Sequence, residues 1–317
     1  MKLKEIYQQA VEIGIKADFR GEEAIKKLLA KQEEKYQQLK NEEKEEFDVE
    51  TLTNPFSDTR ILYGDGEKEI KTILCGIDME VGEVLLADRL KEKGKNVDLV
   101  LAHHPEGKAL AALYDVMHLQ EDILNLLGVP INVAEGILSS RISEVQRGLM
   151  PLNHNRAIDT AKTLDIPMAC IHTPADNLVT KYLDDLFNER SPETVGDVIS
   201  IIKEIPEYKQ AIKDKSGPAV VVGSKDKRAG KVFVDMTGGT GGSEDAYEKL
   251  AQAGVGTIVT MHIGEKHRKE AEKNHINVVI AGHIASDSLG MNLLLGSFTA
   301  QGVEIIPCSG LIRVERN

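Results

Sequence analysis

The 317-residue chain has little cysteine, which limits the kinds of site and compartment it fits. Its three cysteines, Cys75, Cys170 and Cys308, are far apart, and each lies in or beside an apolar run. This spacing argues against a disulfide framework and against a metal site built from thiolates. We expect three buried free thiols in a cytoplasmic protein.

Positive charge and long apolar runs are also scarce. Lys and Arg number 39 against 51 Asp and Glu, for a net charge of −12. A broad nucleic-acid surface or an anionic-membrane patch needs clustered basic residues, so neither partner is expected. No apolar stretch approaches the roughly 20 residues of a membrane span. The opening "MKLKEIYQQAVEIG" has the pattern of an amphipathic helix and lacks a signal-peptide core.

Along the chain, residues 1–48 read as charged helices, to which we attach no function. From about residue 60, short Val- and Ile-rich runs alternate with helical segments, as in "KTILCGID", "EVLLADRLKEKG" and "VDLVLAHH". This rhythm predicts strands joined by crossover helices, and therefore a largely parallel sheet. Segments 115–131 and 191–213 read as helices, and 218–236 reads as a hairpin with a polar turn.

The chain also shows a faint internal similarity. The order strand, helix, strand, histidine occurs twice, with 26 positions from Asp78 to His104 and 27 from Asp235 to His262. Similarity of this kind suggests two related α/β halves. The general likeness of βαβ units is the alternative explanation.

Two adjacent histidines, His103 and His104, end an apolar run in "LVLAHHPEG". Neighbouring side chains on a regular strand point to opposite faces, so one histidine would lie in the core and one on the surface. Where a strand gives way to a loop, the two imidazoles can instead point toward two nearby positions. A two-metal site needs ligands for ions about 3.5–4 Å apart, which makes the pair candidate ligands.

A second stretch, "CIHTPADN", contains His172 and Asp176. Thr173 and Pro174 suit the N-cap and first position of a helix, and Asp176 suits the acidic position of a capping box. Capping therefore explains every polar residue here except His172.

A third stretch, "VVIAGHIASDSLG", places His283 and Asp287 four residues apart. On a helix this spacing brings both side chains to one face, where they could chelate one ion. An exposed His–Asp pair on a helix surface is the alternative.

Other polar residues follow a fourth apolar run. His262 and Glu265 in "VTMHIGEK" are candidate acid–base groups lining the same cavity. The glycine-rich "DMTGGTGGSED" either presents backbone N–H groups to an anion or is simply a tight turn. The remaining histidines, His118, His154, His267 and His275, are expected on the surface or in packing.

Taken together, "TILCGIDM", "DLVLAHHP", "HTPAD" and "VVIAGHIASD", in this order, resemble the NIF-three-like family, also known as the GTP cyclohydrolase I type 2 homologs. The resemblance covers roughly residues 54–317. It implies an α/β fold of two related lobes with mixed, largely parallel sheets and a metal cleft between them. We therefore expect a helical extension over 1–53, a first lobe over 54–213 and a second over 214–317.

The resemblance also implies two divalent metal ions and a homo-oligomer, commonly a hexamer. The implied ligands are His103, His104, Asp176, His283 and Asp287. This chain has Asp287 where the family typically has Glu, lacks the Gly-Gly-x-Asn that usually follows the central Asp, and carries an atypical N-terminal extension. The ligands combine nitrogen and oxygen without thiolate, which suits Zn, Fe or Mn.

The expected function is a metal-dependent hydrolase acting on a nucleotide or another phosphorylated small molecule, as the cyclohydrolase name implies. In this interpretation Glu265 or His262 moves the proton, each adjacent histidine serves one metal, and Asp176 bridges the two. The alternative is a metal-binding interaction or regulatory protein, or a metal chaperone, without turnover. The ligand set would be the same.

Overall fold

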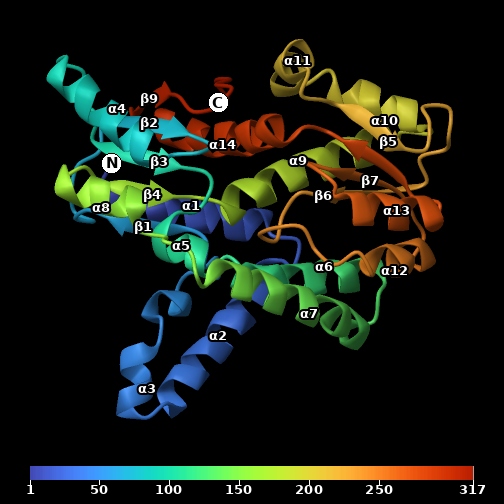
Figure 1. The fold of residues 1–317 in the computed structure, drawn as a ribbon, viewed down its shortest axis with the longest axis horizontal. Helices are drawn as coiled ribbons and strands as arrows, with labels where there is room; N and C mark the ends of the chain where they lie inside the picture. Colours follow the sequence, from blue (N-terminus) through green and yellow to red (C-terminus); the bar gives the residue numbers. More distant parts are fainter. Residues whose placement is uncertain (317) are drawn as a thin grey trace.

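The computed structural model describes residues 1–316, which form two β-sheets flanked by helices (Figure 1). The first sheet has the order β1-β4-β3-β2-β9, and the second has the order β5-β8-β7-β6. The strands are β1 (Arg60–Tyr63), β2 (Thr72–Gly76), β3 (Leu99–Ala102), β4 (Met168–Cys170), β5 (Ala219–Val222), β6 (Lys231–Asp235), β7 (Val255–Thr260), β8 (Asn277–Ile280) and β9 (Glu304–Pro307).

The two sheets share one topology, which confirms the prediction of two related α/β lobes. In each, the first strand of the half lies at an edge and pairs antiparallel with the fourth, in β1–β4 and β5–β8. The remaining pairs within each half are parallel. The first sheet adds β9, which pairs parallel with β2. The expected boundary between the two lobes, at residues 213 and 214, stays a prediction. After the second sheet the chain returns to the first sheet at β9.

Helices cover both faces of both sheets, as a largely parallel sheet requires. The longer ones are α1 (Leu3–Ala17), α2 (Glu22–Gln38), α4 (Val81–Glu92), α6 (His118–Leu127), α7 (Ile131–Leu149), α8 (Arg156–Thr163), α9 (Thr173–Arg190), α10 (Val195–Ile202), α11 (Pro206–Lys213), α13 (Glu265–Lys273) and α14 (His283–Thr299). Shorter segments are α3 (Asn41–Glu46), η1 (Val49–Leu52), α5 (Gly107–Ala111), η2 (Asp115–Met117) and α12 (Ala246–Gln252).

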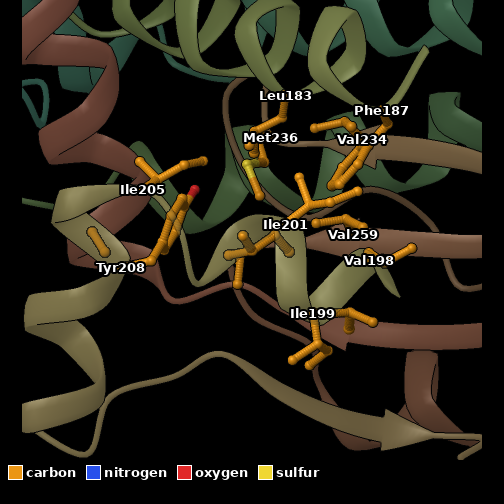
Figure 2. Close-up of a cluster of buried hydrophobic side chains, with 14 of the residues drawn as sticks. Leu183, Phe187, Val198, Ile199, Ile201, Ile205, Tyr208, Val234, Met236 and Val259 are labelled. Atoms are coloured by element: carbon orange, nitrogen blue, oxygen red, sulfur yellow. The ribbon is translucent and has the colours of Figure 1, made fainter. Parts of the chain in front are cut away.

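Two helices, α9 and α14, contribute to the cores of both lobes. Ala175 near the start of α9 packs with the first sheet and α1, whereas Val179 to Phe187 pack with the second sheet, α10 and α11. In α14 the order is reversed: Ala285 and Leu289 belong to the second core, and Met291 to Phe298 belong to the first. Figure 2 shows the second core, where Leu183 and Phe187 lie close to Val234 and Met236. The N-terminal ends of both helices therefore lie at the junction of the lobes.

Two expectations about local structure are wrong. Residues 218–236 do not form a hairpin, because β5 and β6 occupy opposite edges of the second sheet. Their connection is far longer than the two-residue loop of a tight hairpin and crosses the end of the sheet. The single helix expected over 191–213 is interrupted before Pro206, where Ile205 takes an extended conformation, as residues preceding proline favour.

The N-terminal segment divides into a packed part and a projecting part. Leu3, Ile6 and Ala10 of α1 are buried in the first core. Helices α2 and α3 extend away from the body (Figure 1), and Ile25 is the buried side chain of α2. Within residues 1–316, no helix is both long and apolar enough to cross a membrane.

The close approach of α9 and α14 generates a stability prediction. A Cβ atom at Gly290 in α14 would clash with the backbone carbonyl of Ala175 in α9, which has no room to move. We expect Gly290→Ala to destabilise the fold by about 1–3 kcal/mol through overpacking. Gly136→Ala is the control, since that helical position in α7 has open space around it and should gain about 0.5–1 kcal/mol. Urea unfolding measures both; equal midpoints would contradict the packing described.

Candidate metal centre

Six polar side chains converge where the ends of β3 and β4 meet the first turns of α9 and α14. His103 and His104 follow β3 directly, and His172 follows β4 as the N-cap of α9. Asp176 lies in the first turn of α9, while His283 begins α14 and Asp287 lies one turn later. We call these six residues the His/Asp cluster. It contains all five ligands predicted from the sequence, together with His172.

The ring nitrogens of the cluster face the carboxylate oxygens at distances that leave room for a metal ion bound to both atoms. His103 Nε2 lies 3.4 Å from Asp176 Oδ1 and 3.6 Å from Asp287 Oδ1. The other oxygen of Asp287, Oδ2, lies 3.5 Å from both His104 Nε2 and His283 Nε2. His172 Nε2 lies 3.7 Å from Asp176 Oδ2.

Several of these facing atoms are buried without any hydrogen-bond partner. They are His103 Nε2, Asp176 Oδ1 and both carboxylate oxygens of Asp287. Leaving buried polar atoms unpaired costs free energy, and native structures rarely do so without a reason. Nitrogen and oxygen atoms that face one another in this way match the ligands of a divalent transition metal. These residues therefore fit the metal that the sequence resemblance implies.

The outer nitrogen of three cluster histidines is held by a neighbouring oxygen. His103 Nδ1 donates to the Ile171 carbonyl at 3.1 Å, and His104 Nδ1 donates to Asp78 at 2.7 Å. His172 Nδ1 donates to the buried Asp58 at 2.8 Å. A proton on Nδ1 leaves the Nε2 lone pair directed inward, which is the arrangement found around metal-binding histidines.

Electrostatics shows how strongly the cluster attracts positive charge. Burial alone would lower the pKa of His103, but Asp287 and Asp176 outweigh it and raise that pKa to about 10. Burial would likewise raise the pKa of Asp287, yet His103, His104 and His283 hold it well below its usual value. The Asp287 carboxylate is therefore ionised, and a proton on His103 supplies positive charge that a metal ion would also supply.

The geometry explains why two histidines are adjacent. Pairing of β3 stops at Ala102, and the backbone N–H groups of His103 and His104 bond instead to the carbonyls of Gly76 and Ile77. The His103 side chain is fully buried and that of His104 is 27% exposed. Both nevertheless face Asp287, through different oxygens. The two imidazoles thus point toward nearby positions at the end of a strand, as one interpretation of the sequence expects. The other interpretation, with one histidine in the core and one on the surface, describes them less well.

The two candidate acid–base residues lie in different places. The His262 ring lies 5.1 Å from the His283 ring, measured between centroids, and burial lowers the pKa of His262. Glu265 begins α13 as an exposed residue and pairs with Arg268 at 2.9 Å. Its side chain is thus engaged away from the His/Asp cluster. Among the histidines expected elsewhere, His118 pairs with Glu121 on the surface.

Sequence reasoning missed His172 as a cluster member, and with it the supporting residues Asp58 and Asp78. A signal for His172 was present, because His172 and Asp176 have the same four-residue spacing as His283 and Asp287. Capping offered a sufficient explanation of Asp176 and obscured this repeat. Asp58 lies 114 positions from His172, and no local pattern links the two.

A cavity of about 520 Å3 opens beside the cluster and extends along the second sheet toward α6 and α7. His104, His172, Asp176, His283 and Asp287 line one part of it. The glycine-rich turn 238–243, Phe233, Asp235, Tyr247 and His262 line other parts. A small molecule in this cavity would therefore contact both the cluster and the second lobe.

Comparison with protein-family models and with curated proteins finds no match. Among solved structures, the NIF3 superfamily protein from Sphaerobacter thermophilus is similar, with a TM-score of 0.71 and 26% sequence identity. The match covers 80% of this chain and 92% of that one. Reduced HcgD from Methanocaldococcus jannaschii shares the fold at a TM-score of 0.52 and 18% identity, over 86% of this chain and 96% of that one.

Metal binding at the His/Asp cluster should be visible as stabilisation. An ion that binds only the folded state adds about 2.7 kcal/mol when its free concentration is 100 times Kd. We expect Zn2+ or Mn2+ to raise the thermal midpoint of metal-stripped protein and a chelator to reverse the shift. Asp287→Asn should greatly reduce the shift, whereas the surface control His118→Ala should retain it. An undiminished shift in Asp287→Asn would place the metal elsewhere.

Proposed function

This chain belongs to the NIF3 superfamily, and we propose that it is a dinuclear metal-dependent hydrolase of a phosphorylated small molecule. The observation that carries the proposal is that two sets of three ligand atoms share one residue. His103, Asp176 and Asp287 form one of these sets, and His104, His283 and Asp287 form the other, while a third set, of His103, His104 and His172, contains no carboxylate. A carboxylate shared in this way suits two neighbouring cations, whose repulsion it reduces.

In this proposal the bridging residue is Asp287. Its Oδ1 faces His103, and its Oδ2 faces His104 and His283. Asp176 faces His103 and His172 and has no short contact with His104 or His283. The contacts therefore favour Asp287 over Asp176, the residue first expected to bridge. His172 groups with His103 and His104 and faces the second oxygen of Asp176.

The chemistry can be assigned to residues of the cavity. Two divalent ions held by the His/Asp cluster would supply an activated water and a polarised substrate oxygen. His262, beside His283 and with a lowered pKa, is a neutral base at pH 7 and is our candidate for moving the proton. Glu265 is the weaker candidate because Arg268 already holds it on the surface.

The glycine-rich turn supports an anionic substrate group. Four of its carbonyl groups are bonded by side chains: Gln120 binds those of Gly238 and Thr240, Arg141 binds that of Gly241, and His267 binds that of Gly242. The backbone N–H groups of the turn make no hydrogen bond within residues 1–316 and are therefore available for a ligand. Free N–H groups in such a turn suit a phosphate.

The ligand set is compatible with Zn, Fe or Mn, and a cytoplasmic location suits the three free cysteines. A homo-oligomer stays a prediction from the family resemblance, and light scattering tests it. A metal-binding regulatory protein or chaperone would use the same ligands, and the lining of the cavity by a candidate base and an anion site favours the hydrolase.

Metal counts on variants test the bridge. Of the two sets that contain Asp287, one includes His104 and the other includes Asp176. His104→Ala should therefore retain about one equivalent of metal, and Asp176→Asn should also lose mainly one. Asp287→Asn removes charge from both sets and should retain well under one equivalent. Elemental analysis after reloading gives the counts, with His118→Ala as the control. Two equivalents retained by Asp287→Asn would contradict the shared carboxylate.

Turnover tests the hydrolase. We expect metal-loaded protein to hydrolyse at least one member of a panel of phosphoesters and nucleotides, with chelation abolishing and metal restoring the activity. His262→Ala should lower kcat by about 10²–10⁴ while leaving the metal count unchanged. Full metal loading without any turnover, together with a stable protein partner in pull-downs, would support the non-enzymatic alternative.

A further inference from the structure

A second charged group, Asp235, faces the cavity and takes no part in the proposed metal chemistry. It is the last residue of β6, and its neighbours Val234 and Met236 pack into the core shared with α9 and α10. Because side chains alternate along a strand, Asp235 points to the opposite side with Phe233, and both line the cavity. The carboxylate thus meets solvent inside the cavity.

The Asp235 carboxylate has no partner among residues 1–316. No side chain or backbone group donates a hydrogen bond to it, and it forms no ion pair. The surrounding protein raises the pKa of Asp235 to about 6, with His267 opposing this only weakly. His267 is itself directed to the Gly242 carbonyl at 3.0 Å. The Asp235 side chain nevertheless stays exposed to the cavity, so its carboxylate is accessible to a positive or donating group that enters there.

The fold does not require an acid at this position. The sheet registers pair Gly76 with Ala102 in the first lobe and Asp235 with Thr260 in the second, so the two residues are equivalent. At Gly76 a Cβ would lie 2.6 Å from Met79 Sδ and 2.8 Å from the Cys308 carbonyl, and the space is closed. In the second lobe the equivalent position opens into the cavity and carries the charged Asp235.

Aromatic and apolar side chains line the cavity together with the carboxylate. Burial, with a contribution from Asp235, raises the pKa of Tyr247, so the phenol stays neutral beside the acid. The Tyr247 ring lies 5.9 Å from the His267 ring, and Phe233, Leu250 and Ile258 complete this part of the lining. A carboxylate that shares a cavity with aromatic side chains can bind compact organic cations, by ion pairing and by cation–π contact.

We propose that Asp235 and Tyr247 form a specificity site for a cationic nitrogen group, an amidinium or a protonated amine, on the molecule that occupies the cavity. Its description as a substrate site rests on the proposed hydrolase function, but the binding itself does not need the metal. A ligand that places its cation at Asp235 extends along the same cavity to the His/Asp cluster. The substrate class is then a phosphorylated compound that also carries an amine or amidine.

The test uses benzamidine and its neutral isostere benzamide, titrated by calorimetry into metal-stripped and metal-loaded protein. We expect benzamidine to bind wild-type protein in both states, and at least tenfold more tightly than benzamide. Asp235→Asn, nearly isosteric, should weaken benzamidine at least tenfold and leave benzamide unchanged. Asp226→Asn makes the same chemical change in the exposed turn between β5 and β6 and should have no effect.

Two further measurements keep the outcome interpretable. The thermal midpoint of Asp235→Asn should equal or exceed that of the wild type, because an unpaired charge is removed, and its metal count should be unchanged. Equal affinity of Asp235→Asn and wild type for benzamidine, or no binding by wild type up to about 10 mM, would overturn the proposal. Binding that depends on Asp235 in a protein without turnover would instead reject the hydrolase and keep this site.

Discussion

The charge of Asp287 is the constraint on which the centre of the molecule depends. Its carboxylate is fully buried and has no hydrogen-bond donor, yet three imidazoles from one strand end and one helix face it. A buried ion without compensation would destabilise the fold by several kcal/mol. Compensation requires that His103, His104 and His283 stay together, and therefore that the two lobes keep one relative position.

Helices α9 and α14 meet this requirement through their packing. Each crosses from one core to the other, and they approach so closely that Gly290 lies against the Ala175 backbone. Their first turns therefore reach the junction of the lobes from equivalent strands, β4 and β8. Each contributes a histidine and an aspartate four residues apart, so the duplicated fold delivers two similar ligand pairs to one place.

The sequence predicted what local patterns determine and missed what depends on distant contacts. Alternating apolar runs and helices located the strands, and the position of His103 and His104 at a strand end was informative because loop geometry begins there. The hairpin over 218–236 failed because β8 and β7 separate β5 from β6, a pairing no local signal encodes. His172 was missed because capping explained Asp176, and its partner Asp58 lies 114 positions away. Glu265 was favoured although its i,i+3 pair with Arg268 is a local contact within α13.

The two lobes share a topology but differ in what they contribute. The first supplies most of the nitrogen ligands and the residues that orient them, Asp58 and Asp78. It also closes the position equivalent to Asp235 with Gly76 and the added strand β9. The second lobe keeps that position open and adds the glycine-rich turn and His262. Because α9 and α14 fix the lobes together, the metal-binding residues of the first lobe and the cavity lining of the second lobe face the same space. Small changes in the second lobe can therefore alter which small molecule the cavity binds without disturbing the His/Asp cluster.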